Sequence, residues 1–138
     1  MTPEAAPVPR TTTTQIRVRY AETDLLGSVY YANFFTYFGV ARHEHLRQLG
    51  TGLAELLRNE GITMGVLEAS CRYHAPAYFD DLLTVHTRVE EARTRTVVFV
   101  YEVERDGTPI ASGRTVQIFL KDRAPVPIPP RVRGALLQ

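Results

Sequence analysis

Residues 20–50 read YAETDLLGSVYYANFFTYFGVARHEHLRQLG and contain the only long helical pattern of the chain. Apolar side chains recur there at steps of three and four residues, which predicts one helix from about Tyr31 or Ala32 to Leu49. The recurring positions are Phe34, Phe38, Ala41, His45 and Leu49, and Phe35 and Leu46 widen the same stripe. Gly39 is costly in the middle of a helix and predicts a close approach by another backbone segment. The remaining sequence is expected to pack around this helix.

An acidic side chain, Asp24, precedes the start of the predicted helix by a few residues. The first backbone N–H groups of a helix have no intrahelical partner and carry a partial positive charge. They can therefore bind a carbonyl oxygen that is becoming negative. A carboxylate just upstream can attack the same carbonyl or direct a water at it. The combination indicates acyl transfer.

Most of the remaining sequence alternates between apolar and polar residues, which is typical of strands. The segments with this alternation begin with Ile16, Val18 and Tyr20 and continue at residues 62–73, 83–89, 97–103 and 116–120. Only one long helix is available to cover one face of this five-stranded, mainly antiparallel sheet. The sequence therefore predicts an α+β hotdog fold, in which the sheet wraps around a central helix.

Three local signals add detail to this fold. Apolar residues occupy even-numbered positions before Leu67 and odd-numbered positions after it, which predicts a β-bulge there. The Asp106-Gly107 step predicts a tight hairpin. A short second helix is expected from about Leu53 to Asn59. A sheet of this kind has an unpaired edge, and pairing with a second copy would cover it. We therefore expect a homodimer or a homotetramer.

The chain divides into one domain and two terminal segments. Residues 1–14 are rich in Pro and Thr and lack periodicity, so a disordered tail is expected. Residues 15–122 are expected to form the domain, and residues 123–138, which include RAPVPIPPR, a proline-rich extended segment. With 138 residues the chain is too short for two ordinary domains.

Composition and charge exclude several classes of function. The net charge is +1, and basic and acidic residues are interspersed, so nucleic acid is not an expected partner. No apolar run is long enough to cross a membrane, and the first residues have no signal-peptide core. The single cysteine, Cys71, allows no intramolecular disulfide and fits a reducing compartment, so we expect a cytoplasmic protein. The four histidines have no metal-binding spacing.

The motif YAETDLLGSVYYANFFTY at residues 20–37 resembles the 4-hydroxybenzoyl-CoA thioesterase-like family of hotdog-fold acyl-CoA thioesterases. The resemblance rests on a strand ending in Tyr20, an acidic loop with Asp24, a Gly three residues later, and Y-x-N-x-x-x-Y at the helix start. It continues in CRYHAPAYFDDLLTV and PVPIPP, so it covers nearly the whole chain.

The resemblance implies a set of site residues. Asp24 would act as nucleophile or general base on a thioester carbonyl, and the backbone N–H of Tyr31 would bind the carbonyl oxygen. Gly27 would keep the loop tight, and Tyr20 would line the site. Coenzyme A is then part of the substrate, and no metal or other cofactor is expected.

The same segment also allows structural interpretations. Asp24 can cap the loop or the helix start. Asn33 can cap the helix or hold the bound thioester or a water, and Phe34 belongs to the core or to an acyl pocket. Glu22 is interpreted as an exposed loop acid, and Glu44 as a solvated partner in an ion pair.

Together these features predict an acyl-CoA thioesterase that converts a small, medium-chain or aromatic acyl-CoA to the free acid and CoA. An acyl-carrier protein is the alternative carrier of the acyl group. The other functions considered are a non-catalytic acyl-CoA or acyl-carrier-protein binding module and a hydroxyacyl-thioester dehydratase. A dehydratase of this fold needs an acid/base pair that includes a histidine, and residues 24–33 contain none.

Overall fold

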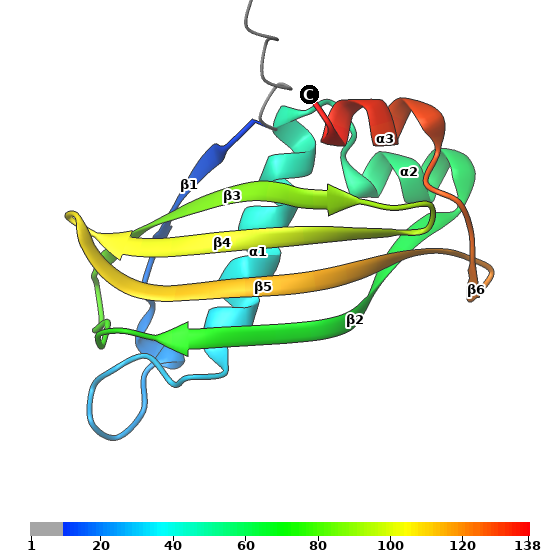
Figure 1. Ribbon diagram of the computed structural model, residues 1–138. Coiled ribbons are helices and arrows are strands. Elements are labelled where there is room, and N and C mark those ends of the chain that lie inside the picture. Colours follow the sequence, from blue (N-terminus) through cyan, green and yellow to red (C-terminus); the bar gives the residue numbers. More distant parts are fainter. Residues whose placement is uncertain (1–9) are drawn as a thin grey trace, which may run out of the picture.

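One long helix and five long strands make up most of the structure, a computed structural model that describes residues 10–138. The elements in chain order are β1 (Thr12–Arg17), the 3₁₀ turn η1 (Tyr20–Glu22), α1 (Asn33–Gln48), α2 (Leu53–Glu60), β2 (Ile62–Tyr73), β3 (Leu82–Ala92), β4 (Thr96–Arg105), β5 (Thr108–Lys121), β6 (Ala124–Pro125) and α3 (Pro130–Leu136). This is the predicted α+β hotdog fold, with α1 crossing one face of the sheet (Figure 1).

The strands form one sheet in the order β1-β3-β4-β5-β2, and every neighbouring pair is antiparallel. The two-residue β6 pairs with β5. The predicted bulge is confirmed by a register shift between Val66 and Glu68. The predicted hairpin is also confirmed: Asp106 and Gly107 join β4 to β5, and both have a positive φ. The sheet therefore ends in β1 on one side and in β2 on the other.

The core lies between α1 and the sheet. The helix residues that it buries are Phe34, Tyr37, Phe38, Ala41, His45 and Leu46. The ring of Phe38 stacks on Tyr101 of β4 with a centroid distance of 4.6 Å, and His45 meets the edge of Phe99 at 5.9 Å. All of these positions except Tyr37 belong to the predicted apolar stripe, so the spacing of three and four residues identified the buried face.

Both predicted terminal segments need correction. Thr12, assigned to the disordered tail, pairs with Thr87 as the first residue of β1; residues 1–9 lie outside the described part of the chain. The C-terminal segment is not extended throughout, because it ends in α3, which buries Val132 and Leu136. Pro130 opens α3, and proline is favoured at the first helical position because its missing N–H would have no partner there.

A buried polar pair joins β1 to the far end of α1. His45 is 1% exposed, and its Nδ1 lies 2.6 Å from Oγ1 of Thr12. His45 is therefore a hydrogen-bonded residue of the core. Burial lowers the pKa of His45 to about 4, with a smaller contribution from the charge of Arg10. His45 is neutral in the folded protein at pH 7.

This histidine should make the stability of the fold depend on pH. An unfolded histidine binds a proton below about pH 6.5, whereas folded His45 does so only near pH 4. Its contribution to stability is thus complete above pH 6.5 and is lost as the pH falls. We expect the free energy of unfolding to decrease by about 2 kcal/mol between pH 7 and pH 5. Urea unfolding at both pH values measures it, and His45→Gln should remove most of the difference. An equal pH dependence in that variant would contradict the prediction.

Candidate active site

The acidic loop between η1 and α1 is a closed turn that lies beside the end of β2 (Figure 1). The N–H of Asp24 donates to the carbonyl of Ser28 at 2.8 Å, and the N–H of Gly27 donates to the carbonyl of Asp24 at 3.0 Å. Thr23 and Val29 form an antiparallel bridge across the base of the loop. Gly27 has a φ of +82°, which residues with a Cβ rarely adopt. Its backbone therefore fits the predicted role of keeping the loop tight.

The carboxylate of Asp24 is held by one of its two oxygens. Oδ1 accepts a hydrogen bond of 2.8 Å from the N–H of Leu26 and lies 3.4 Å from Oγ of Ser28. Within residues 10–138, no group donates to Oδ2. Asp24 therefore caps its own loop, but it does not cap α1, whose N-cap position is Ala32. The bond to Oδ1 orients the carboxylate and leaves the second oxygen open.

The turn before α1 contains backbone N–H groups that have no hydrogen-bond acceptor in the described part of the chain. The helix begins at Asn33, so Tyr31 and Ala32 lie just outside it, one or two residues later than the predicted start. In the described part of the chain, the N–H groups of these two residues make no hydrogen bond. The hydroxyl of Tyr73 donates to the carbonyl of Tyr31 at 3.0 Å and holds the turn in place. Free N–H groups at a helix start can bind a developing oxyanion.

Asp24 and this turn line one groove of about 420 Å³. The loop and the helix start contribute Asp24, Ser28, Val29, Tyr31 and Phe34, and residues 73–77 form the opposite wall. Phe34 is 3% exposed, and its ring meets the ring of Tyr73 edge-on at 5.6 Å. The structure thus brings three of the predicted site residues, Asp24, Tyr31 and Phe34, to one space.

The opposite wall of the groove was not identified from the sequence. Its position depends on contacts between two loops that lie about 50 residues apart: the N–H of Val29 donates to the carbonyl of Ala77 at 2.8 Å, and Ser28 bridges to Tyr78. His74 in this wall has its Nε2 3.0 Å from Oγ of Ser112. No local pattern reveals such pairing, and the motif CRYHAPAYFDD was the only available signal.

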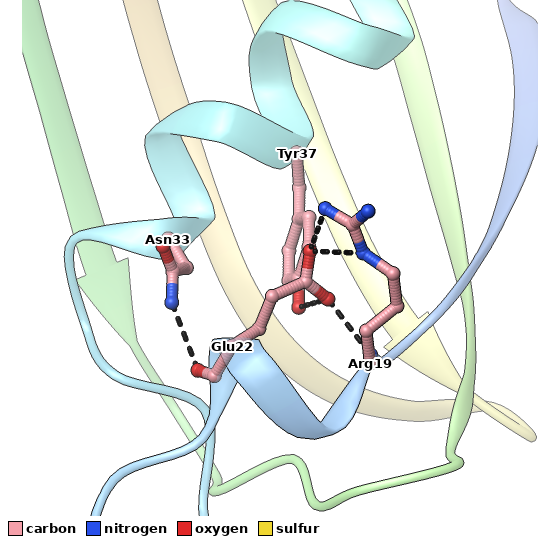
Figure 2. A network of polar contacts seen from close by, with 4 residues as sticks. All are labelled: Arg19, Glu22, Asn33 and Tyr37. Carbon is pink, nitrogen blue, oxygen red and sulfur yellow. Dashed lines mark hydrogen bonds and ion pairs between the residues drawn. The ribbon is translucent and has the colours of Figure 1, made fainter.

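Glu22 is not the exposed acid that the sequence suggested. It is 8% exposed, and Oε1 accepts hydrogen bonds from the hydroxyl of Tyr37 at 3.0 Å and from the N–H of Arg19 at 2.8 Å. Oε2 accepts from Nε and Nη2 of Arg19 at 3.1 and 3.0 Å (Figure 2). Burial raises the pKa of the carboxyl, but the hydrogen bonds from Arg19 and Tyr37 outweigh it and bring the pKa below its usual value. The spacing of three residues between Arg19 and Glu22 was the overlooked signal.

Tyr20 and Asn33, the other expected substrate contacts, do not line the groove. Tyr20 is 77% exposed, and its ring packs edge-on against Phe79 at 5.7 Å. The side-chain amide of Asn33 donates to the carbonyl of Glu22 at 2.8 Å (Figure 2), so it ties the helix start to the acidic loop. A substrate contact for either residue stays a prediction.

The remaining candidates have structural partners. Glu44 pairs with Arg47 on the surface of α1, which confirms its interpretation as a solvated ion-pair residue. Within residues 10–138, no group of three His, Cys, Asp or Glu side chains could hold a metal ion. The helices described there are all too short or too polar to cross a membrane.

Comparison with known proteins gives consistent matches over most of the chain. The profile of the thioesterase-like superfamily matches residues 18–136. The acyl-CoA thioesterase YbgC of Haemophilus influenzae is 34% identical over 123 residues, which cover 87% of this chain and 90% of that protein. A 1,4-dihydroxy-2-naphthoyl-CoA hydrolase of Thermosynechococcus vestitus is 32% identical over 118 residues, or 83% of this chain and 81% of that protein. The structure of a gentisyl-coenzyme A thioesterase has a TM-score of 0.85 at 28% identity and covers 92% of this chain and 100% of its own.

Proposed function

Because the chain belongs to the thioesterase-like superfamily and is a thioester hydrolase, we propose that it hydrolyses a small, medium-chain or aromatic acyl-CoA to the free acid and CoA. The observation that carries the proposal is that Asp24 and Tyr31 line the same groove. Within residues 10–138, no group donates to Oδ2 of Asp24, and the N–H of Tyr31 makes no hydrogen bond. One group supplies the attack on the carbonyl, and the other stabilises the charge that this attack creates.

The chemistry follows from these two groups. The carbonyl oxygen of the thioester accepts a hydrogen bond from the N–H of Tyr31, which stabilises the oxyanion by roughly 3 kcal/mol. Asp24 acts as nucleophile or as general base. As a nucleophile, its Oδ2 bonds to the carbonyl carbon, the CoA thiolate leaves, and water cleaves the resulting anhydride. As a base, it takes a proton from the water that attacks the carbonyl carbon directly, and the tetrahedral intermediate then expels the CoA thiolate. Both routes consume one water and need no cofactor beyond the CoA of the substrate.

The residues that line the groove favour a substrate with an apolar acyl group. Three aromatic residues, Tyr31, Phe34 and Tyr73, line the groove together with Asp24, and aromatic linings bind flat or hydrophobic groups well. Two relatives carry aromatic acyl groups in their names, a dihydroxynaphthoyl and a gentisyl group. Aromatic thioesters therefore belong among the first substrates to test. The single cysteine and the need for acyl-CoA both favour the cytoplasm as the place of action.

The test is release of free thiol from short, medium-chain and aromatic acyl-CoAs, with wild type and Asp24→Asn in parallel. Hydrolysis by wild type that is lost in the variant supports the proposal. Tight binding of acyl-CoA without hydrolysis would instead identify a binding module, and loss of water from a hydroxyacyl-CoA would identify a dehydratase. Acyl-carrier-protein thioesters form the second panel of substrates. Activity on these alone would show that the acyl group is delivered by an acyl-carrier protein and not by CoA.

We also propose that the active form is a homodimer or a homotetramer. The outer edge of β2 has no partner strand within residues 10–138, and Val66 and Leu67 on it are 57% and 56% exposed. An open edge with apolar side chains favours pairing with a second strand. A second copy that pairs along β2 would extend the sheet across both subunits.

This arrangement predicts a mass of at least twice 15.5 kDa in solution. A lysine at the sheet edge opposes strand pairing because its charge would have to be buried. We expect Val66→Lys to shift the mass towards that of the monomer, and Leu137→Lys, at an exposed position on the C-terminal side of α3, to leave it unchanged. Analytical ultracentrifugation measures both. A wild-type monomer, or equal masses for the two variants, would overturn the proposed pairing.

A further inference from the structure

We infer that Glu22 is a positioning residue for the proposed hydrolysis, because it fixes the Asp24 loop against the helix start that binds the thioester carbonyl. The inference rests on the proposed roles of Asp24 and Tyr31. Glu22 does not line the groove. It is buried behind it and acts through the segments that it joins.

The carboxylate of Glu22 connects Arg19, which follows the last residue of β1 by two positions, to the second turn of α1. It accepts three hydrogen bonds from Arg19 and one from Tyr37, at distances between 2.8 and 3.1 Å (Figure 2). Tyr37 is 1% exposed and packs edge-on against Phe34, one of the groove residues. Because four donors hold the Glu22 carboxylate, it has a single orientation and fixes the distance between Arg19 and Tyr37 of α1.

The backbone carbonyl of Glu22 connects the same residue to the turn before α1. It accepts a hydrogen bond of 2.9 Å from the N–H of Tyr30 and one of 2.8 Å from the amide of Asn33. Tyr30 and Asn33 lie on either side of the turn that carries the Tyr31 N–H. Asp24 follows Glu22 by two residues. Glu22 is therefore the point through which the carboxylate of Asp24 and the N–H of Tyr31 are held at a fixed separation.

The charge of Glu22 is balanced within the network. Nη2 of Arg19 forms a salt bridge of 3.0 Å with Oε2, so the pair adds no net negative charge near the place where the oxyanion develops. Burial and the neighbouring Glu22 carboxylate both raise the pKa of Tyr37, so its hydroxyl stays protonated and remains a donor. The network thus orders the site without adding net charge to it.

A loss of this network should reduce the rate of the chemical step more than the binding of substrate. A displacement of about 1 Å between reacting groups can lower a rate by about a hundredfold. For Glu22→Gln we expect kcat to fall by roughly tenfold to a hundredfold, with KM changing less than about threefold because the groove residues are intact. Tyr37→Phe, which removes one of the four hydrogen bonds, should lower kcat by about tenfold.

Tyr101→Phe is the matched control for Tyr37→Phe. The hydroxyl of Tyr101 is also buried; it lies 2.7 Å from Oγ1 of Thr115 and accepts a hydrogen bond from Arg42 at 3.2 Å, away from the groove. Both variants remove a buried hydroxyl and should lower the melting temperature by similar amounts. Only Tyr37→Phe should lower kcat. Equal effects of the two variants on kcat would show a general loss of stability and would overturn the positioning role.

Hydrogen exchange gives a second readout that does not need an active enzyme. Backbone amides of residues 23–31 should exchange faster in Glu22→Gln and in Tyr37→Phe than in wild type and in Tyr101→Phe, because the loop is then less firmly held. If wild type hydrolyses no thioester, the proposed function fails and the catalytic meaning of the positioning role fails with it. Faster exchange would then still show that Glu22 fixes the Asp24 loop against the helix start. Unchanged exchange in both variants, or an effect confined to KM, would overturn it.

Discussion

Replacing Asp24 by Asn is expected to reduce kcat/KM for acyl-CoA hydrolysis by about a hundredfold to ten-thousandfold, the range of a lost general base. The substitution removes the negative charge and keeps a carbonyl oxygen at the position of Oδ1. That oxygen can still accept the hydrogen bond from the N–H of Leu26, so the loop should keep its shape. The loss would therefore report on chemistry, because the fold and the groove are retained.

Two further variants separate the catalytic role of Asp24 from its role as a loop cap. Asp24→Ala removes the charge and the acceptor for Leu26, so it should lower the melting temperature as well as the activity. Glu44→Gln removes an exposed acid on α1 and should leave activity unchanged. Thiol release and thermal unfolding measure the three variants side by side. An active Asp24→Asn protein would exclude the carboxylate as nucleophile or base.

The sequence was sufficient for the parts of the molecule that local patterns encode. The spacing of Phe34, Phe38, Ala41 and His45 identified the buried face of α1, and Asp106-Gly107 identified the hairpin. Each signal comes from residues that are close together in the sequence, so it can be read without knowledge of the fold. The hotdog arrangement followed because one helix had to cover one sheet.

The second wall of the groove and the environment of Glu22 depend on contacts that sequence order does not contain. Residues 73–77 face Asp24 only because two distant loops exchange backbone hydrogen bonds. Glu22 appeared exposed because acids in loops usually are, yet Tyr37, fifteen residues away, supplies a buried donor. Burial of a charged group is decided by the partners that the fold brings together.

The sequence also did not show which glycine lies against another segment of the fold. Gly39 was expected to mark a close approach, but within the described residues a Cβ there would meet only Nη2 of Arg42, at 3.7 Å. The close approach occurs at Gly113 in β5, where a Cβ would lie 2.2 Å from Cε2 of Phe38. Nothing in the sequence around Gly113 distinguishes it from a tolerated glycine in a strand, because its neighbour across the core comes from α1.

Gly113→Ala is therefore expected to destabilise the protein by about 3 kcal/mol, at the upper end of the usual range for overpacked cores. The ring of Phe38 cannot move aside easily, because it is fully buried and stacked on Tyr101. For a domain of this size, the change corresponds to a decrease in melting temperature of roughly 10 °C. Thermal unfolding followed by circular dichroism measures it.

Gly134→Ala in α3 is the control, because within residues 10–138 an added Cβ would meet nothing within 4 Å apart from its chain neighbours and the backbone of its own helix. Alanine is the better helix former, so this variant should be as stable as wild type or more stable by up to about 1 kcal/mol. Phe38→Leu combined with Gly113→Ala gives the decisive comparison. A smaller side chain at Phe38 removes the clashing ring atoms, so the loss in the double variant should be smaller than the sum of the two single losses. Additive losses would mean that the cost of Gly113→Ala arises in the backbone of β5 and not in its contact with the central helix.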